Sequence, residues 1–471
     1  VLILFVGILI TKSLLLTSRQ LLAKQVQLPG IEESSYHRLS HAIQFPTISH
    51  IHKSDNDKLV FSDFHQFLES SFPLVFSKLT VERFNDFALL LCWVGDNPAL
   101  DPVVLTAHMD VVPADPTDSW KYPPFSGHDD GVEIWGRGTL DDKSSLMAIM
   151  EALETLLQQG FTPQHTLYIA FGHDEEIDGE YGAATLATIL HERGIKAEFV
   201  LDEGMVVTHN IVPMMKDPVA LIGTSEKGFM NLKITVKADG GHASMPASEN
   251  VASILAKTLI KINANPLDKK FTKPVDDFLE FLAPEVPPVP RVLFANRWLF
   301  DPLLLKVYEG TASGNALVRT TVAPTVIRAG VQDNILPNEA TALLNIRILP
   351  ESSSDDVIKY YGDLIDDPRI NVDLVGFPRE PAPVSPVDVP AFELIHQVVK
   401  DCFPKAIVCP TLMLGASDSR HYSLISDNIY RFAPYELYPE TINTIHGVNE
   451  RITRNNYDKC IAFYYLLMQK C

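Results

Sequence analysis

The segment His108-Met109-Asp110 places a histidine and a carboxylate two residues apart, directly after the apolar run Val103 to Ala107. If that run is a β-strand, its period of two puts both side chains on one face. A carboxylate that accepts one ring N–H fixes the histidine tautomer and leaves the other nitrogen for a metal ion. An isolated pair of this kind is more often a capped loop with a surface histidine, so the interpretation requires support from elsewhere in the chain.

Acidic residues that give this support flank other apolar runs; they are Asp141 and Asp142, Glu175 and Glu176, and Asp202 and Glu203. An aspartate before a helix is commonly an N-cap, and runs of acids are commonly solvated. Directly after buried strands, however, their mutual repulsion is costly without a cation. Of two adjacent glutamates, one can bind a metal ion while the other takes a proton from water.

A second imidazole comes from His446, in the segment Ile445 to Glu450 near the end of the chain. A histidine in a glycine turn is usually structural. His446 matters because it would complete a set of metal ligands. Two histidines with three carboxylates suit zinc better than calcium, which prefers oxygen ligands alone. We expect two zinc ions that share one carboxylate.

The elements that must position these side chains alternate between strand and helix. Apolar runs at Thr166 to Phe171 and Glu198 to Leu201 indicate buried strands, and helical spacing extends over Lys143 to Gln159 and Tyr181 to Arg193. This alternation predicts an α/β fold with a mixed, mostly parallel sheet flanked by helices. Ligands collect at the carboxyl ends of such strands, where these polar residues stand.

The pattern changes near Gly228, because Phe229 to Val236 and Thr341 to Ile348 alternate with period two around a helix at Val251 to Ile262. We therefore predict that residues 224–349 form an inserted α+β domain, which would serve as a lid over the site or form a dimer. The catalytic domain would consist of residues 20–223 and 350–471. Residues Pro284 to Pro290 are predicted to form a surface loop.

Composition narrows the classes of function. The chain has 471 residues, 46% of them hydrophobic, and 39 Lys and Arg against 59 Asp and Glu give a net charge of −20. Such a surface repels phosphates, which argues against a nucleic-acid partner. Five scattered cysteines do not form a disulfide framework, although one bridge between Cys402 and Cys409 stays open.

Residues 1–19 have the character of a targeting segment. Val1 to Ile10 is an unbroken apolar run, followed by Lys12 and a second short run. Its length favours a signal peptide, with an uncleaved membrane anchor as the alternative. The expected location is secreted or in the lumen of the secretory pathway, or else on a membrane through this segment.

The order and spacing of seven strings resemble the aminoacylase/carboxypeptidase family of co-catalytic zinc exopeptidases over nearly the whole chain. Within it, the resemblance is to the branch of N-fatty-acyl-amino acid synthase/hydrolases and carboxypeptidase S. The strings are His108 to Pro113, Gly136 to Lys143, Gly172 to Glu176, Asp202 to Gly204, Gly241 to Ser244, Asp418 to Arg420 and His446 to Glu450.

This resemblance implies roles for individual residues. His108 and Asp202 would bind one zinc ion, Glu176 and His446 the other, and Asp141 would bridge them. Asp110 would orient His108, and Glu175 would be the general base. In some relatives the acid at the place of Glu203 is the ligand instead of the one at Asp202.

Three further residues are assigned by the same resemblance. His242 would polarise the scissile carbonyl, often across a homodimer formed by the inserted domain, while Asn334 and Arg420 would hold oxygen atoms of a small-molecule substrate. For Arg420 a surface ion pair is the alternative.

The expected activity is hydrolysis, and reversible formation, of the amide bond of N-fatty-acyl amino acids. One alternative is a carboxypeptidase or aminoacylase acting on short peptides or small N-acyl amino acids. Another is a metal-free relative that serves as a binding or carrier module. Apolar residues that could line an acyl groove, or equally form an amphipathic core helix, are Trp298, Leu299, Phe300, Leu303 and Leu304.

Overall fold

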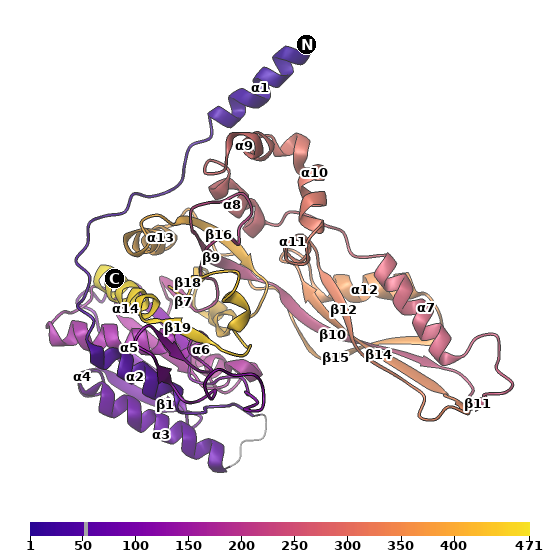
Figure 1. Ribbon diagram of the computed structural model, residues 1–471, viewed down its shortest axis with the longest axis horizontal. Helices are drawn as coiled ribbons and strands as arrows, with labels where there is room; N and C mark the ends of the chain where they lie inside the picture. The colour runs from indigo at the N-terminus through magenta and orange to yellow at the C-terminus, as the bar shows by residue number, and fades with distance from the viewer. Residues whose placement is uncertain (51–54) are drawn as a thin grey trace.

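A computed structural model of the chain describes residues 1–50 and 55–471. Figure 1 shows a larger part, in which helices surround a central sheet, and a smaller elongated part built on a second sheet. The two termini of the chain both belong to the larger part, and helix α1 (Leu2–Leu14) projects from it.

The central sheet is mixed, and it is parallel where β3 pairs with β6 and β7. Its strands, in the order in which they lie side by side, are β1 (Thr80–Phe84), β2 (Ala88–Trp93), β6 (Leu167–Gly172), β3 (Val103–His108), β7 (Phe199–Asp202), β17 (Ile429–Arg431), β9 (Val219–Glu226), β8 (Val207–Thr208) and β18 (Glu436–Leu437), and β16 (Ile407–Met413) also pairs with β9. The predicted α/β class is confirmed. Parallel pairing brings the carboxyl ends of β6, β3 and β7 to one edge.

Helices cover both faces of this sheet. Successive residues of a strand point to opposite faces, so apolar side chains such as Leu105 and Val104 need a helical layer on each side. Leu105 of β3 packs in the core with α2 (Glu33–Ile43), α3 (Asp55–Ser71), α4 (Pro73–Lys78), α5 (Lys143–Gln158), α13 (Pro390–Cys402) and α14 (Arg454–Lys470). Its neighbour Val104 packs in a second core with α6 (Ala183–Glu192) and the 3-10 helix η2 (Asp418–Leu424).

The smaller part is an antiparallel sheet with helices α7 (Val251–Ala264) and α12 (Ser354–Ile365) packed against it. Its strands lie in the order β12 (Thr321–Ala329), β14 (Glu339–Ile348), β10 (Gly228–Lys237) and β15 (Ile370–Arg379). A two-stranded ribbon of β11 (Gly241–His242) and β13 (Ile335–Leu336) extends it at the end far from the central sheet (Figure 1).

The structure corrects the predicted limits of the inserted domain in two ways. Strand β15 pairs with β10, so the second sheet continues past residue 349 to Arg379. Within the predicted insert, α8 (Lys273–Leu282) instead packs on β16, and Val275 and Leu279 belong to the core of the larger part. Helices α9 (Pro288–Ala295), α10 (Arg297–Glu309) and α11 (Ala312–Val318) follow α8.

Local elements follow the sequence pattern closely. The predicted helix at Lys143 to Gln159 is α5, and the predicted strands before Asp110, Glu175 and Asp202 are β3, β6 and β7. A small sheet of β4 (His128–Asp129), β5 (Glu133–Trp135) and β19 (Arg451–Thr453) joins the middle of the chain to its last part. The proline-rich segment differs from the predicted loop, because α9 begins at Pro288 and proline is well accommodated in the first helical turn.

The N-terminal residues form α1 and then an extended segment that lies on the larger part. The Gln20 carboxamide pairs with the backbone of Val408, accepting from its N–H at 2.7 Å and donating to its carbonyl oxygen at 2.9 Å. None of the helices in the described part of the chain combines the length and apolar character needed to cross a bilayer. All five cysteines are free thiols, so the bridge that the sequence left open is not formed.

Candidate metal centre

Side chains from five regions of the sequence meet at the edge where β3, β6 and β7 end. His108 is the last residue of β3, Glu175 and Glu176 open the 3-10 helix η1 (Glu175–Ile177) after β6, and Glu203 follows β7. Asp141 precedes α5, and His446 lies between the 3-10 helix η3 (Ile442–Thr444) and β19. The sheet topology therefore explains why residues distant in sequence converge.

Asp141 stands at the centre of the group. Its Oδ1 lies 2.9 Å from His108 Nε2, and its Oδ2 lies 2.9 Å from His446 Nε2. Glu203 Oε1 is 3.6 Å from His108 Nε2, and Glu176 Oε1 is 3.3 Å from His446 Nε2. Two sets of metal-ligand type thus share the Asp141 carboxylate: His108 with Glu203, and Glu176 with His446.

Burial makes this concentration of acids costly. Loss of solvent, together with the neighbouring Asp141 carboxylate, raises the pKa of Glu203 to about 8. Burial also raises the pKa of Glu175 well above its usual range. Hydrogen bonds with Asp141 and Glu176 raise the pKa of His446 to about 10. The donor set is therefore one that divalent cations would neutralise, and its mixture of imidazole and carboxylate fits zinc.

Asp110 occupies the predicted position behind His108. The Asp110 backbone carbonyl oxygen is hydrogen-bonded to His108 Nδ1 at 3.0 Å, and Asp110 Oδ1 lies 3.4 Å from the same nitrogen. The two carboxylate oxygens accept hydrogen bonds from the backbone N–H groups of Glu175 and Glu176, each at 3.1 Å. Asp110 thus links the His108 ring to the turn that carries both glutamates.

Asp202 does not face this centre. Its Oδ2 accepts from the Ser419 N–H at 2.7 Å and its Oδ1 accepts from the Glu203 N–H at 2.9 Å. Asp202 is the last residue of β7 and pairs with Arg431 of β17, so it points to the opposite side from its successor. This geometry differs from the expectation that Asp202, rather than Glu203, is the metal ligand beside His108.

Arg420 lies beside the centre, against the residue that follows η1. Its Nη2 donates to the Asp178 carbonyl oxygen at 2.8 Å and to Asp178 Oδ1 at 3.1 Å. Arg379, from the end of β15, pairs with the same carboxylate. Two guanidinium groups therefore share one acid, which leaves an excess of positive charge at the junction of the two sheets.

His242 and Asn334 are together, but far from the metal centre of their own chain. His242 lies in β11, and the Asn334 carbonyl oxygen accepts from the Ala243 N–H at 3.1 Å at the outer end of the second sheet (Figure 1). Both residues are exposed to solvent. One chain alone does not bring them to His108.

Two buried acids without a predicted role, Glu450 and Glu226, hold the loops around the centre. Glu450 accepts from Arg137 Nη1 at 2.6 Å and from the N–H of Leu140 at 2.8 Å, next to Asp141. Glu226 accepts from the Ser419 hydroxyl at 2.7 Å and from Arg431 Nε at 2.5 Å. No sequence signal pairs these residues, because their partners lie far away along the chain.

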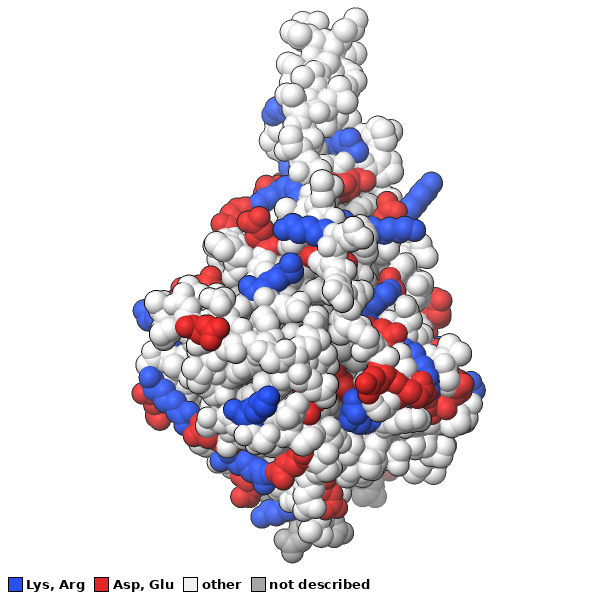
Figure 2. Space-filling view, turned by 90° about the vertical axis from the view of Figure 1, so that its left-hand side faces the viewer, with Lys and Arg blue, Asp and Glu red and all other residues white. Residues whose placement is uncertain are grey.

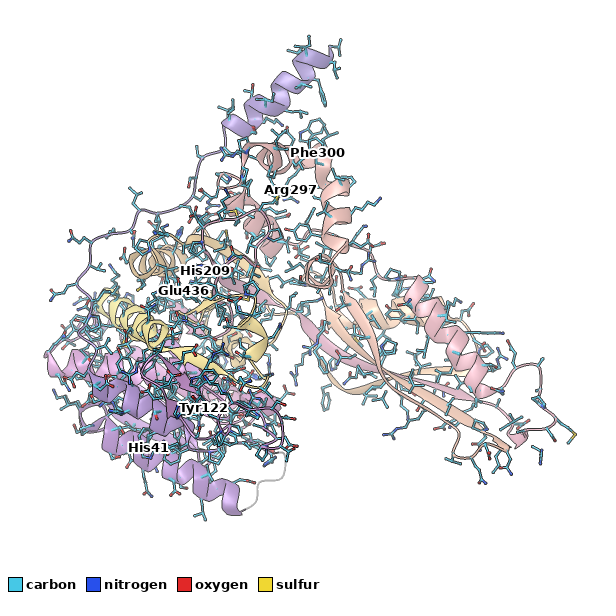
Figure 3. All side chains as sticks on the ribbon, in the orientation of Figure 1. His41, Tyr122, His209, Arg297, Phe300 and Glu436 are labelled. Carbon is cyan, nitrogen blue, oxygen red and sulfur yellow. The ribbon has the colours of Figure 1, made fainter. Side chains whose placement is uncertain are left out.

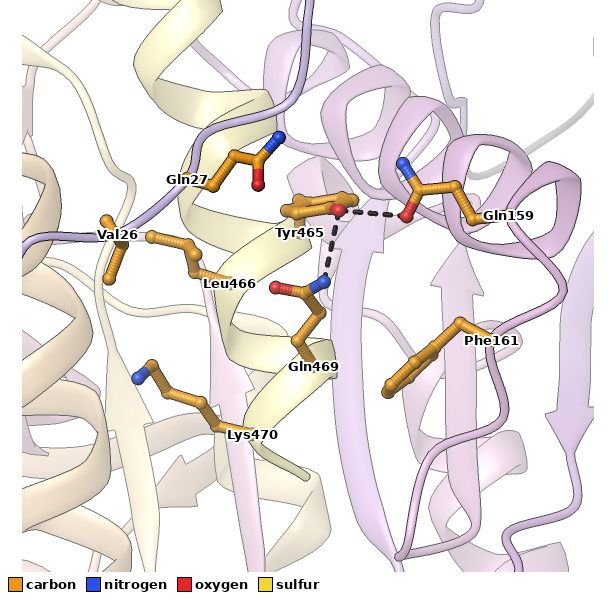
Figure 4. A pocket seen from close by; sticks show the side chains of 8 residues that line it. All are labelled: Val26, Gln27, Gln159, Phe161, Tyr465, Leu466, Gln469 and Lys470. Carbon is orange, nitrogen blue, oxygen red and sulfur yellow. Dashed lines mark hydrogen bonds between the residues drawn. The ribbon is translucent and has the colours of Figure 1, made fainter.

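A separate cavity of about 500 Å³ lies at the C-terminal helix and contains none of these residues (Figure 4). Tyr465, Gln159 and Gln469 are hydrogen-bonded within it. Its lining side chains are Val26, Gln27, Gln159, Phe161, Tyr465, Leu466, Gln469 and Lys470. It offers neither an acid nor a histidine and is not part of the candidate centre.

Comparison with known proteins decides the family. Residues 104–470 match the model described as peptidase family M20/M25/M40. The chain belongs to this family. M20 membership makes it a metal-dependent amidohydrolase or peptidase, and it confirms the resemblance drawn from the sequence motifs.

Curated M20 relatives cover most of the chain. It is 39% identical to an N-fatty-acyl-amino acid synthase/hydrolase of Danio rerio, over 91% of this chain and 84% of the relative. It is 38% identical to a probable carboxypeptidase S-like protein of Dictyostelium discoideum, over 92% of this chain and 84% of that one.

Solved M20 structures show the same fold. An M20 family metallo-carboxypeptidase of Sulfolobus solfataricus aligns with a TM-score of 0.67 and 18% identity, covering 93% of this chain and 99% of that chain. Human carnosine dipeptidase 1 aligns with a TM-score of 0.61 and 13% identity, covering 94% and 100% of the two chains.

Proposed function

We propose that the chain is a di-zinc amidohydrolase that cleaves, and reversibly forms, the amide bond of N-fatty-acyl amino acids. The observation that carries the proposal is the position of Asp141 between two sets of ligands. His108 and Glu203 would hold one zinc ion, and Glu176 and His446 the other, with Asp141 shared. Glu203 replaces Asp202 in this assignment because the Asp202 oxygens already accept backbone hydrogen bonds.

The zinc ions, when bound, supply Lewis acids that polarise the scissile carbonyl and make water easier to deprotonate. Glu175 takes the proton from the attacking water and passes it to the leaving amine. The Glu175 carboxylate lies close to His108 and Glu176, but neither of the two sets of metal ligands that share Asp141 includes it. Asp110 holds the turn of Glu175 and the ring of His108 in one arrangement.

For substrate recognition, we assign the free carboxylate of the amino acid to Arg420. The guanidinium groups of Arg420 and Arg379 share the single acid Asp178, so a second carboxylate is favoured there. The fatty-acyl preference rests on the names of the relatives, of which several are N-fatty-acyl-amino acid synthase/hydrolases.

His242 and Asn334 would act on the site of a second copy of the chain. They lie together at the exposed end of the second sheet, away from their own metal centre. We therefore propose a homodimer formed through the second sheet, in which this end reaches the partner's site and His242 stabilises the developing oxyanion.

For location, we propose the secretory route, with α1 retained as a membrane anchor. The support is the apolar run that forms α1 and its contacts with α9 and α10, which hold the segment against the folded chain.

A carboxypeptidase acting on short peptides is the second candidate, because other relatives carry the name carboxypeptidase S. The test is elemental analysis of the purified protein followed by rates on N-oleoyl-phenylalanine, N-acetyl amino acids and blocked dipeptides. We expect two zinc ions per chain and the highest kcat/KM on the N-oleoyl substrate. A higher value on dipeptides supports the carboxypeptidase, and a protein without zinc and without turnover supports a binding module.

A further inference from the structure

Helix α1 exposes apolar side chains around its whole circumference at its outer end. Leu2, Ile3, Leu4, Phe5 and Val6 are consecutive and all exposed, with Ile3 at 89%. Successive residues of an α-helix point about 100° apart, so five in a row leave no polar side. A helix that is apolar all round belongs in an apolar surrounding.

The exposed helix is attached to a second apolar surface on α10. The rings of Phe5 and Trp298 meet edge to face, with centroids 6.5 Å apart, and Asn296 Nδ2 donates to the Leu9 carbonyl oxygen at 3.0 Å. Figure 3 shows Arg297 and Phe300 at the start of α10, near the end of α1. The two helices therefore present their apolar side chains together.

Side chains that the sequence assigned to an acyl groove or to a core helix lie largely at this surface. Of those five, Trp298 is 62% exposed, Leu303 48% and Leu299 38%, and Leu304 alone is buried, at 4%. Val307, further along the same helix, is 63% exposed. We call residues 1–14 and 288–308 the apolar platform. In Figure 2 its α1 portion stands above the rest of the molecule and is almost free of charged atoms.

The charge of the apolar platform is opposite to that of the whole chain. It contains the four cations Lys12, Arg291, Arg297 and Lys306, and the single acid Asp301, which pairs with Arg297. Asp276 of the neighbouring α8 also pairs with Arg297, at 2.7 Å, so the net charge at this surface is about +2. Lys12 Nζ lies 5.6 Å from the ring centroid of Trp298, at the boundary between apolar and charged side chains. The chain as a whole carries −20.

We propose that the apolar platform, including α10, docks the protein on an anionic lipid bilayer. A protein partner covers one side of a helix, whereas the end of α1 is apolar on every side and requires a surrounding that is apolar in all directions. A second copy would bring two cationic platforms together. Tryptophan and lysine at the edge of an apolar surface are typical of the membrane interface, and cations near it favour anionic lipid.

The first experiment measures sedimentation of the full chain with vesicles of phosphatidylcholine, with and without phosphatidylserine. Two net positive charges at the interface predict roughly thirtyfold stronger binding to vesicles with phosphatidylserine. Lys12→Glu with Lys306→Glu should remove this preference. Equal binding to both kinds of vesicle, or an unchanged preference in that variant, would overturn the choice of an anionic surface.

The second experiment tests whether α10 takes part. Trp298→Ser, Leu303→Ser and Val307→Ser together should weaken vesicle binding by at least about tenfold, from the lost burial of three apolar side chains. The matched control changes Leu59, Val94 and Val132 to Ser; these are 60%, 66% and 66% exposed and lie outside both the apolar platform and the second sheet. Thermal unfolding checks that both variants are folded.

Either of two results would overturn the role of α10: unchanged binding of the α10 variant, or an equal loss in the control. If the full chain does not bind vesicles but is a dimer that the α10 variant dissociates, the platform is an interface between copies and the lipid proposal is wrong. Zinc content and turnover do not enter these readouts, so they are independent of the proposed activity.

Discussion

His108 and His446 contact different oxygens of one carboxylate, that of Asp141, each at 2.9 Å. They come from the end of a central strand and from a turn before the last helix. Their meeting at one side chain shows how the larger part of the fold builds a single centre from distant segments, in which two groups of metal-ligand type share Asp141.

The choice between Glu203 and Asp202 is open to a direct comparison. Glu203→Gln should lower the zinc content, because the Glu203 carboxylate faces His108 at 3.6 Å. Asp202→Asn should keep the zinc and lose at most about 10–100-fold in metal affinity, as for residues that support a ligand. Elemental analysis of both variants checks this. Full zinc content in Glu203→Gln with loss in Asp202→Asn would restore Asp202 as the ligand.

Glu175→Gln separates metal binding from proton transfer. The variant should retain its zinc and lose about 10²–10⁴-fold in kcat, because a general base contributes this much and the amide cannot accept a proton. Glu180→Gln, an exposed residue a few positions further along, is the control with unchanged kcat. Near-normal turnover of Glu175→Gln would refute the base assignment.

Glu450 supports the loop of Asp141 and should matter for stability. Glu450→Gln leaves the buried Arg137 guanidinium without its charged partner at 2.6 Å. Breaking a buried pair on one side typically costs about 3–5 kcal/mol of free energy of unfolding. Chemical denaturation measures the change. Glu249→Gln, in an exposed pair with Lys257, should leave the midpoint where it is.

One outcome would contradict the prediction for Glu450. If Glu450→Gln unfolds at the same denaturant concentration as the unchanged protein, the pair with Arg137 does not stabilise the loop.

His396 should make the attachment of the N-terminal segment depend on pH. Its Nε2 lies 3.5 Å from the Leu21 N–H, and burial, with the cations of Lys400 and Arg19, lowers its pKa to about 4. The ordinary pKa is 6.5, so the unfolded chain takes up the proton first. The stabilisation is complete above pH 6.5 and is lost as the pH falls towards 4, at about 1.4 kcal/mol for each unit.

Hydrogen exchange of residues 18–27 at pH 7 and pH 5, corrected for intrinsic rates, measures this effect. Faster corrected exchange at pH 5 is expected, and His396→Gln should show no such difference because glutamine does not titrate. Equal corrected rates at both pH values in the unchanged protein would contradict the prediction.

Much of the larger part could be predicted because its signals are local. Apolar runs and helical spacing indicated β3, β6, β7 and α5, and the parallel arrangement then placed their carboxyl ends together. The limit of the insert could not be found in this way. Strand β15 joins the second sheet through pairing with β10, a contact between segments distant in sequence.

The difference between the expected and the observed position of Asp202 has an equally specific cause. On a strand, neighbouring side chains point to opposite faces, so a shift of one residue exchanges the inward and outward positions. The sequence places two acids at the end of this strand but does not show at which residue the strand pairing ends. The register of Asp202 with Arg431 decides it. The role of His242 stays a prediction, because this residue lies at the outer end of the second sheet and would need a second copy of the chain.

The central claim is that two zinc ions share Asp141. Anomalous diffraction at the zinc edge, from crystals of the zinc-loaded protein, tests it most directly. We predict two peaks about 3.5–4 Å apart, one beside His108 and Glu203 and one beside Glu176 and His446. A single peak, or peaks that do not touch Asp141, would contradict the claim.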